Sequence, residues 1–214
     1  MTTVTTATQL ADLGFEVFPL KQDGKPYTEN GFKDATSNSE LIVEAWKTFP
    51  DALIGVYTGG SGIVVLDLDM KVSPEGEVLV DGFTSLDEAW HDVPETFAYD
   101  SRNGLGRHLV YRVPEGKNLP RQMGYRGMKG VDRCSGAGYV AWMGGVPQPG
   151  EIVDAPDWLL DEKKVQDKHE YRGDVLNWFE GLTPGEPNAL VRKAMERAQT
   201  RFEEFGNDFN HGQM

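Results

Sequence analysis

A short apolar run that ends in acidic residues limits the folds open to this chain more than any other feature. Residues 63–69 read Ile-Val-Val-Leu-Asp-Leu-Asp. A run of this length, rich in β-branched residues, is typical of a strand that is buried on both faces of a sheet. The sequence therefore predicts a central strand over Ile63–Asp69 that carries two carboxylates at its end.

Helix and strand signals alternate from the amino terminus to Pro156. The other expected strands are Phe15–Leu20, Leu53–Tyr57, Thr96–Tyr99, Arg107–Val113 and Gly138–Trp142. The expected helices are Thr8–Leu13, one capped by Ser39 that ends before Pro50, and one capped by Ser85 that ends at Trp90. The polar segment Met70–Gly82 between them reads as a loop or a small hairpin. We therefore predict an α/β (α+β) domain with a mixed sheet over residues 1–156.

The signal changes to helices after Pro156. The expected helices there are Asp157–Val165, Gly173–Phe179 and Pro187–Phe205. We expect residues 157–214 to form a helical tail that links to a further region. The last residues have neither a helix-stop signal nor an apolar anchor, so we also expect the natural polypeptide to continue.

Composition excludes several classes of protein. The one cysteine, Cys134, leaves no intrachain disulfide and no cysteine-rich zinc cluster. No apolar run approaches the roughly 18 residues that span a bilayer, and the amino terminus lacks the pattern of a secretory signal. These features predict a cytoplasmic protein with no membrane partner.

The charge distribution is uneven along the chain. The net charge of −13 argues against a nucleic-acid partner. However, the segment Asp100–Arg133 has eight basic and three acidic residues, whereas Pro74–Tyr99 has seven acidic residues and no basic one. The basic segment is therefore a candidate phosphate-facing surface, and a solvated strand face is the alternative.

The acidic pair Asp67 and Asp69 suggests a metal site. Residues two apart in a strand project to the same face, so the two carboxylates are expected to lie side by side. They would repel each other unless a cation sat between them, and hard oxygen ligands suit Mg²⁺ or Mn²⁺. Acidic pairs also occur at strand ends that are simply solvated, so the pair alone does not establish a metal site.

Two further segments could complete such a site. His108 follows Gly104-Leu-Gly106, where glycines permit a phosphate to approach the backbone closely, although a lone histidine is more often structural. Asp132 lies in Gly130-Val-Asp-Arg133 before a glycine-rich turn. It could be a third metal ligand or a simple turn residue.

Taken in order, the motifs resemble those of a known family. They are Gly14-Phe-Glu-Val-Phe-Pro-Leu20, Gly31-Phe-Lys-Asp-Ala-Thr36, Ile54-Gly-Val-Tyr-Thr-Gly59, Val65-Leu-Asp-Leu-Asp69, Gly106-Arg-His108, and Gly130-Val-Asp-Arg133 with Gly138-Tyr-Val140. Over Leu13–Pro156 the chain resembles the amino-terminal primase-polymerase domain of the archaeo-eukaryotic primase superfamily, of the kind carried by phages and plasmids.

This resemblance implies an RRM-like catalytic sheet packed on a smaller αβ module. It implies that Asp67, Asp69 and Asp132 bind Mg²⁺ or Mn²⁺ and that His108 contacts the phosphates of the incoming nucleotide. The further candidates for nucleotide contact are Lys33, Thr58, Arg107 and Arg133. The implied partners are nucleoside triphosphates, a single-stranded DNA template with its primer, and a helicase domain in the same or a partner polypeptide.

The sequence departs from the family pattern at one place. Many relatives continue the third motif into Ala-Pro-Pro-Ser, whereas this chain reads Ala141-Trp-Met-Gly-Gly145. The zinc-binding stem of some relatives is also missing. Two other functions remain open: a non-catalytic single-stranded DNA-binding module that recruits a helicase, and an unrelated metal-dependent hydrolase or glycosyltransferase.

Overall fold

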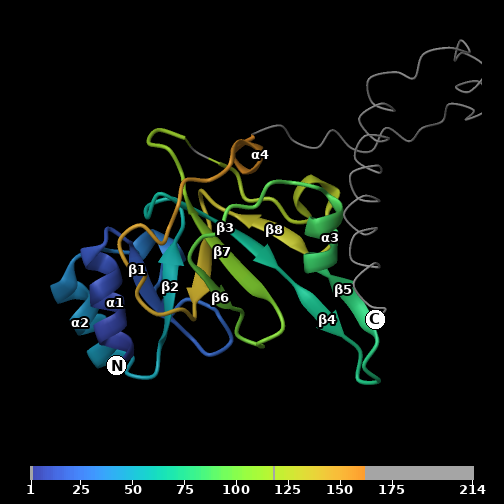
Figure 1. Ribbon diagram of the computed structural model, residues 1–214. Coiled ribbons are helices and arrows are strands. Elements are labelled where there is room, and N and C mark those ends of the chain that lie inside the picture. The colour runs from blue at the N-terminus through green and yellow to red at the C-terminus, as the bar shows by residue number, and fades with distance from the viewer. Residues whose placement is uncertain (1, 118, 162–214) are drawn as a thin grey trace, which may run out of the picture. The chain divides into compact units, whose positions relative to one another are not determined.

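The computed structural model describes residues 2–117 and 119–161, and Figure 1 shows how their helices and strands are arranged. The helices are α1 (Thr3–Asp12), α2 (Ser39–Thr48), α3 (Gly82–Glu88) and α4 (Asp157–Leu160), with the 3₁₀ turns η1 (Gly31–Asp34) and η2 (Tyr125–Gly127). The strands are β1 (Val17–Leu20), β2 (Leu53–Tyr57), β3 (Ile63–Leu68), β4 (Met70–Val72), β5 (Val78–Asp81), β6 (Ala98–Asp100), β7 (Arg107–Arg112), β8 (Val131–Cys134) and β9 (Tyr139–Trp142).

Three sheets contain these strands. Their orders are β1-β2-β9, β6-β7-β3-β8 and β4-β5. Every pairing between the strands of the described residues is antiparallel, and a parallel contact occurs only as an isolated bridge between Arg112 and Asp154. The predicted α/β (α+β) class is confirmed, with antiparallel sheets where the sequence suggested a mixed one. Antiparallel neighbours need no crossover helix, which fits the small number of helices.

β3 is a central strand, as its apolar sequence predicts. It pairs with β7 along one edge and with β8 along the other. Its side chains alternate between two apolar clusters, because Val65 belongs to the first and Leu66 to the second. A strand that faces a core on both sides must be apolar on both faces, which is why residues 63–66 carry no polar side chain.

We call these two clusters core 1 and core 2. Core 1 joins the β6-β7-β3-β8 sheet to the β1-β2-β9 sheet and to helices α1 and α2; its members include Leu10, Ile42, Trp46, Val56, Val65, Val110 and Val140. Core 2 lies on the opposite face of β3, under α3 and α4; its members include Leu66, Leu86, Tyr111, Tyr125, Val131, Leu159 and Leu160. The amino-terminal αβ module and the central sheet thus share core 1.

Two helix caps differ from the sequence prediction. Asn38 caps α2 in place of Ser39, and its side-chain oxygen accepts two backbone N–H groups. Asp81 caps α3 in place of Ser85 by accepting from the backbone N of Thr84 at 3.0 Å. Asn and Asp are as good at the cap position as Ser. Each precedes the predicted serine in the chain, so each helix begins earlier than the sequence predicts.

The segment expected to be a loop or small hairpin, residues 70–82, forms the β4-β5 hairpin and the start of α3, and the hairpin extends away from the central sheet (Figure 1). Its apolar side chains Val72, Val78 and Leu79 are exposed. None of the helices in the described residues is long and apolar enough to span a bilayer.

Of the helix expected over residues 157–165, the structure has only α4, which ends at Leu160 because Asp161 is extended; residues 162–165 lie outside the described residues. α4 packs into core 2 through Leu159 and Leu160. The helices predicted at Gly173–Phe179 and Pro187–Phe205 lie outside the described residues. The division into a domain over 1–156 and a helical tail over 157–214 stays a prediction.

Candidate active site

Neighbouring strands bring the key predicted residues into one row. Asp67 of β3 pairs with His108 of β7 on one side and with Asp132 of β8 on the other. Residues directly opposite each other in antiparallel strands point to the same face of the sheet. Asp67 is two residues beyond Val65, so this is the face that carries core 1. Three side chains far apart in sequence therefore meet at one edge of core 1.

The ring of His108 is fixed by contacts to both nitrogens. Tyr99 lies opposite His108 on β6, and its hydroxyl is 3.0 Å from Nδ1. The two rings meet edge to face with centroids 4.9 Å apart. On the other side, Nε2 lies 3.2 Å from Oδ1 of Asp67. His108 is buried, so its orientation is set before any ligand binds.

One oxygen of Asp67 has no hydrogen bond. Oδ1 is buried and lacks a donor, because the nearby Nε2 of His108 is within ion-pair distance but not in hydrogen-bonding geometry. A buried charged oxygen without a donor is costly and rare in native proteins. A buried carboxylate oxygen that accepts no hydrogen bond is free to bind a cation, so Asp67 Oδ1 fits the role of a metal ligand.

Asp132 is buried beside the other carboxylates. Burial raises the pKa of its carboxyl, the negative charges of Asp67 and Asp69 raise it further, and a hydrogen bond from the backbone N–H of Gly124 at 2.8 Å lowers it. Two nearby carboxylates destabilise the charged form of a third. A divalent cation would remove this repulsion, so the donor set fits a hard metal ion.

Asp69 lies one residue beyond the end of β3, at the junction with the hairpin. Its backbone N donates to the Gly130 carbonyl at 2.7 Å, and its carbonyl accepts from the backbone N of Gly82 at 2.8 Å. A Cβ on Gly82 would lie 2.1 Å from the Gly130 oxygen, so this close junction requires glycine. The Asp69 carboxylate is 3.4 Å from Nζ of Lys71. The junction holds Asp69 next to the chain that enters β8.

The three carboxylates are near one another but are not arranged as a finished site. Within residues 2–117 and 119–161, no group of three or more His, Cys, Asp and Glu side chains stands ready to hold a metal ion. The backbone positions are set by the strand register and the Asp69 junction. Closing a three-carboxylate site therefore requires rotation of side chains.

Thr58 and Lys33 are not seen at the row of carboxylates. Thr58 is fully buried, and its hydroxyl donates to the carbonyls of Gly136 at 3.3 Å and Gly138 at 3.0 Å. It therefore ties the β2-β3 turn to the turn after β8 and has no free donor for a nucleotide. Lys33 is exposed in η1, which packs on β1 and β2, and its neighbour Phe32 contacts the ring of Tyr57.

The two arginine candidates point away from the acidic row. Arg107 precedes His108 on β7 and so faces the opposite side, where it forms an exposed ion pair with Asp100 at 3.0 Å. Arg133 follows Asp132 on β8 and is buried on the core 2 side with its guanidinium over the ring of Tyr125. The structure thus places neither arginine in the acidic row, since adjacent residues of a strand lie on opposite faces, and their contact with a nucleotide stays a prediction.

Two residues that sequence reasoning did not single out belong to the site. Tyr99 holds His108, and its only signal in the sequence was its place at the end of an expected strand. Arg121 is exposed and lowers the pKa of Asp132 by its positive charge, so it lies near the carboxylates. No hydrogen bond or ion pair of its side chain is found in the described part of the chain.

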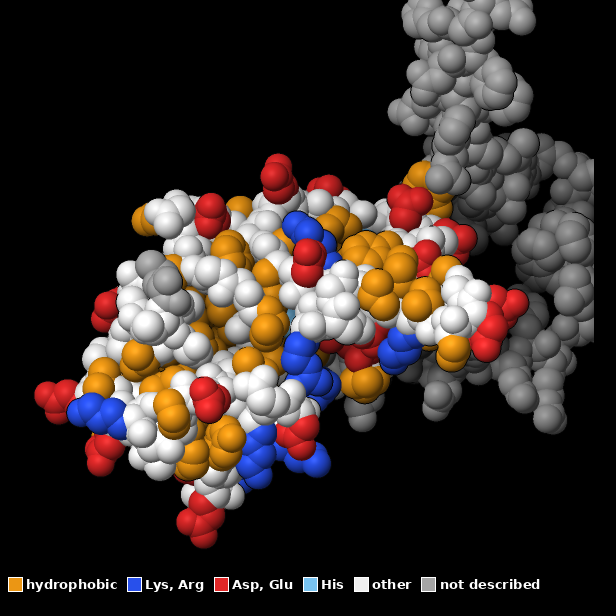
Figure 2. Space-filling view, turned by 90° about the horizontal axis from the view of Figure 1, so that it is seen from below, with side chains coloured by type: hydrophobic (Ala, Val, Ile, Leu, Met, Phe, Trp, Pro, Cys, Tyr) orange, Lys and Arg blue, Asp and Glu red, His pale blue; other side chains and the backbone are white. Residues whose placement is uncertain are grey.

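The basic segment is not one continuous phosphate-facing surface. Lys117, Arg126 and Arg133 donate to the end of α4 and to neighbouring groups. Arg121 is the member found near the acidic row. Figure 2 shows Lys and Arg side chains in the middle of one face of the molecule, with Asp and Glu side chains beside them.

Comparison with known protein families shows which family the chain belongs to. Residues 7–162 match the family described as bifunctional DNA primase/polymerase, N-terminal. The chain belongs to this family. The matched region includes Asp67, Asp69, His108 and Asp132, and it also includes α4. Comparison with curated proteins finds no significant match.

Membership of the primase/polymerase family indicates which substrates such a row of side chains would meet. The family implies nucleotide and DNA substrates. The departure at residues 141–145 is explained in part by packing, because Trp142 is buried in core 1 and a Cβ on Gly144 would lie 2.9 Å from the ring of Tyr99. This segment therefore supports the tyrosine that holds His108.

Proposed function

We propose that this protein is a DNA primase and DNA polymerase that joins nucleotides on a single-stranded DNA template by a two-metal mechanism. The observation that carries the proposal is the strand register, which lines up Asp67 with His108 and Asp132 on one face of the central sheet. The primase/polymerase family match supports the same reaction. Nucleotidyl transfer needs clustered carboxylates beside groups that bind phosphates.

In the reaction, the oxygen of a primer 3′-hydroxyl bonds to the α-phosphorus of a nucleoside triphosphate and gives its proton to water. The bond from this phosphorus to the β-phosphate oxygen breaks, and pyrophosphate leaves in line. Bound Mg²⁺ or Mn²⁺ would stabilise the attacking and leaving oxygens together. Asp67 and Asp132 would supply oxygen ligands from adjacent strands, and Asp69 would supply them from the backbone junction after β3. Because backbone hydrogen bonds fix these positions, little reorganisation is needed beyond side-chain rotation.

His108 and Arg121 would bind the triphosphate. The Tyr99 hydroxyl holds Nδ1 of His108, so Nε2 faces the side on which Asp67 and Asp132 lie. Arg121 is an exposed cation on the same side as Asp132. A fixed imidazole and a flexible guanidinium together can neutralise part of the triphosphate charge.

Replacement of His108 by alanine is expected to raise the KM for nucleoside triphosphate about tenfold to a hundredfold, the value of one hydrogen bond to a charged group. Tyr99→Phe keeps the ring but removes the hydroxyl 3.0 Å from Nδ1, so a smaller rise is expected. Steady-state kinetics against triphosphate concentration measure both. An unchanged KM in His108→Ala would contradict the assigned contact.

Replacement of Arg121 by alanine is expected to raise the KM for triphosphate by about threefold to tenfold, because an exposed charge pair is weak. Arg121→Lys should recover part of the loss, since it keeps the charge. Arg112→Ala is the matched control: Arg112 is exposed on β7 and lies opposite Ile63, four residues along the strand from His108. Equal effects of Arg121→Ala and Arg112→Ala would show that only bulk charge matters.

The proposal also includes the biological role of the protein. The resemblance to phage and plasmid proteins supports a role in replication of such an element in the host cytoplasm, with a helicase in the same or a partner polypeptide. A non-catalytic module that binds single-stranded DNA is the alternative. It would gain thermal stability from single-stranded DNA and none from Mg²⁺ or Mn²⁺ with nucleotide.

An incorporation assay tests the activity itself. The protein is incubated with single-stranded DNA, with and without a primer, with ribonucleotides or deoxynucleotides, and with Mg²⁺, Mn²⁺ or EDTA. We expect template-dependent products in the presence of a divalent cation and none in EDTA. Absence of product under every combination, with folded protein that binds single-stranded DNA, would favour the binding module.

A further inference from the structure

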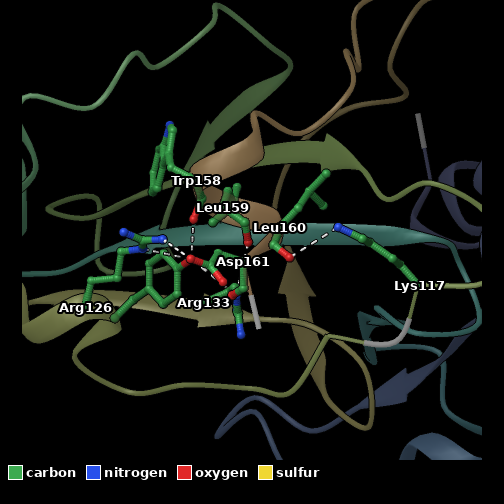
Figure 3. Close-up of polar contacts among 8 residues, drawn as sticks. Lys117, Arg126, Arg133, Trp158, Leu159, Leu160 and Asp161 are labelled. Atoms are coloured by element: carbon green, nitrogen blue, oxygen red, sulfur yellow. Dashed lines mark hydrogen bonds and ion pairs between the residues drawn. The ribbon is translucent and has the colours of Figure 1, made fainter. Parts of the chain in front are cut away.

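Arg133 is a buried arginine whose three guanidinium nitrogens each lie within hydrogen-bonding distance of a protein oxygen. Figure 3 shows its contacts with the end of α4. Nε and Nη2 donate to the Pro120 carbonyl at 3.3 and 3.1 Å. Nη1 lies 3.0 Å from the Leu159 carbonyl, 2.8 Å from the Asp161 carbonyl and 3.2 Å from the Tyr125 hydroxyl. One guanidinium therefore joins the segment before β8 to the end of α4.

The same residue also shapes the segment through its backbone. Arg133 and Gln122 exchange two backbone hydrogen bonds, of 3.0 and 2.8 Å, along the outer edge of β8. The guanidinium carbon lies 4.6 Å from the centre of the Tyr125 ring. Residues 120–125 are thus tied to Arg133 at their start, their middle and their end.

This segment places the only hydrogen-bond donor found on the Asp132 carboxylate within the described residues. The backbone N–H of Gly124 donates to Oδ1 of Asp132 at 2.8 Å. Gly124 has a φ of +56°, and the following Arg126 has a φ of +54°, a conformation that L side chains rarely adopt. Such a turn persists only where surrounding contacts hold it. The contacts of Arg133 surround this turn, together with the ion pair of Arg126 with Asp161 and the hydrogen bond from the Tyr125 hydroxyl to the Trp158 carbonyl.

We propose that Arg133 is a positioning residue for the acidic site. From the core 2 face of β8 it holds residues 120–125 in the shape that directs the Gly124 N–H at Asp132, and it fastens α4 to the same segment. The inference rests on the proposed function for its catalytic consequence. Its structural content, a link from Arg133 to the Gly124 amide, can be tested without activity.

An arginine is needed because its planar fork reaches carbonyls on two segments at once. Lysine carries the same charge but is a single donor centre without the fork. Arg133→Lys should therefore keep a buried cation but lose part of the link between Pro120, Tyr125 and α4. A role in stability alone predicts a lower melting temperature and an unchanged Asp132 environment.

Amide hydrogen exchange on the ¹⁵N-labelled full chain separates these two roles. In Arg133→Lys, the Gly124 amide is expected to exchange at least about tenfold faster, because its opening no longer requires breaking the guanidinium contacts. The Val56 amide in β2 serves as the internal reference and should not change. A Gly124 amide that stays as protected as in the wild type would overturn the proposal.

Metal affinity gives a second readout that a role in stability alone would not move. Mn²⁺ is titrated into the folded protein well below its melting temperature, and half-saturation is expected at about tenfold higher Mn²⁺ in Arg133→Lys, as for the loss of an outer contact to a ligand. Equal Mn²⁺ affinity together with unchanged Gly124 exchange would leave Arg133 as a core residue only. If the wild type binds Mn²⁺ but incorporates no nucleotide, the proposed function fails while the exchange result still decides this inference.

Two further variants keep the test decisive if Arg133→Lys does not fold. Tyr125→Phe removes only the hydroxyl, which accepts from Arg133 and donates to the Trp158 carbonyl at 2.6 Å. It should loosen Gly124 in the same direction by a smaller factor. Lys117→Ala is the matched control, because Lys117 reaches the Leu160 carbonyl of α4 at 3.5 Å and has no hydrogen bond or ion pair with residues 120–125 in the described structure. Loosening of Gly124 by Lys117→Ala as strong as by Tyr125→Phe would contradict a specific role of Arg133.

Discussion

Replacement of Asp67 by alanine is expected to lower nucleotide incorporation on the order of ten-thousandfold, as for loss of one member of a catalytic unit. Asp67 stands between His108 and Asp132 in the strand register, so it is shared by both halves of the site. Its buried Oδ1 has no hydrogen bond in the described residues and so fits a cation ligand. In the proposed site, removal of this carboxylate would take away the ligand that stands between the other two groups.

The fold should survive this change. The Asp67 carboxylate makes no hydrogen bond through Oδ1, so its loss leaves no buried donor of the backbone unpaired. Asp100→Ala is the matched control: Asp100 is an exposed aspartate of the same sheet whose ion pair with Arg107 lies on the other face. Activity, circular dichroism and melting temperature are measured for both variants. Wild-type incorporation by a folded Asp67→Ala protein would refute the metal assignment.

Replacement of Asp132 by asparagine is expected to abolish incorporation and yet to stabilise the metal-free protein at neutral pH. Burial and the charges of Asp67 and Asp69 raise the pKa of Asp132 above its ordinary value of 3.8. The charged carboxylate therefore destabilises the folded state. Asparagine has nearly the same shape, and its side-chain oxygen can still accept from the Gly124 N–H. Such a gain in stability with loss of activity is common at functional sites.

The pH dependence of this effect has a definite sign. A carboxyl whose pKa is higher in the folded than in the unfolded state binds protons more tightly when folded, so the stability that it contributes is present at low pH and is lost as the pH rises through the folded-state pKa. The melting temperature of Asp132→Asn in EDTA should thus exceed that of the wild type at pH 7, and the difference should shrink as the pH falls below the folded-state pKa. Mg²⁺ or Mn²⁺ should raise the melting temperature of the wild type more than that of the variant. A variant less stable than the wild type at pH 7 would contradict the repulsion between carboxylates.

Several strands of the two larger sheets could be predicted from the sequence. β2 matches its predicted bounds, and β3 and β7 each end one residue earlier than expected. These strands could be predicted because their apolar residues follow the pattern of buried strands. β8 was not predicted as a strand. It is four residues long and carries Asp132 and Arg133, two charged residues that the structure buries. The partners that make this burial tolerable lie on other segments and leave no local signal.

The sequence pointed to the acidic residues of the candidate site but not to the residues that lie around them. Ordered motifs identified Asp67 and Asp132, but only the register of paired strands shows that they are direct neighbours. The sequence alone did not show that Arg133 lies on the face opposite Asp132, which follows because residues adjacent in a strand point to opposite faces. Tyr99 contacts His108 from the neighbouring strand β6, and the charge of Arg121 acts on Asp132. A single sequence does not reveal either relation.

The central claim is that Asp67, Asp69 and Asp132 share divalent cations on one face of the sheet. Crystals grown with Mn²⁺ and a non-hydrolysable nucleoside triphosphate, measured at a wavelength that gives anomalous scattering from manganese, test it most directly. The account predicts anomalous peaks within bonding distance of Asp67 and Asp132, with the triphosphate beside His108. Peaks bound elsewhere, or bound nucleotide with no metal at these carboxylates, would contradict it.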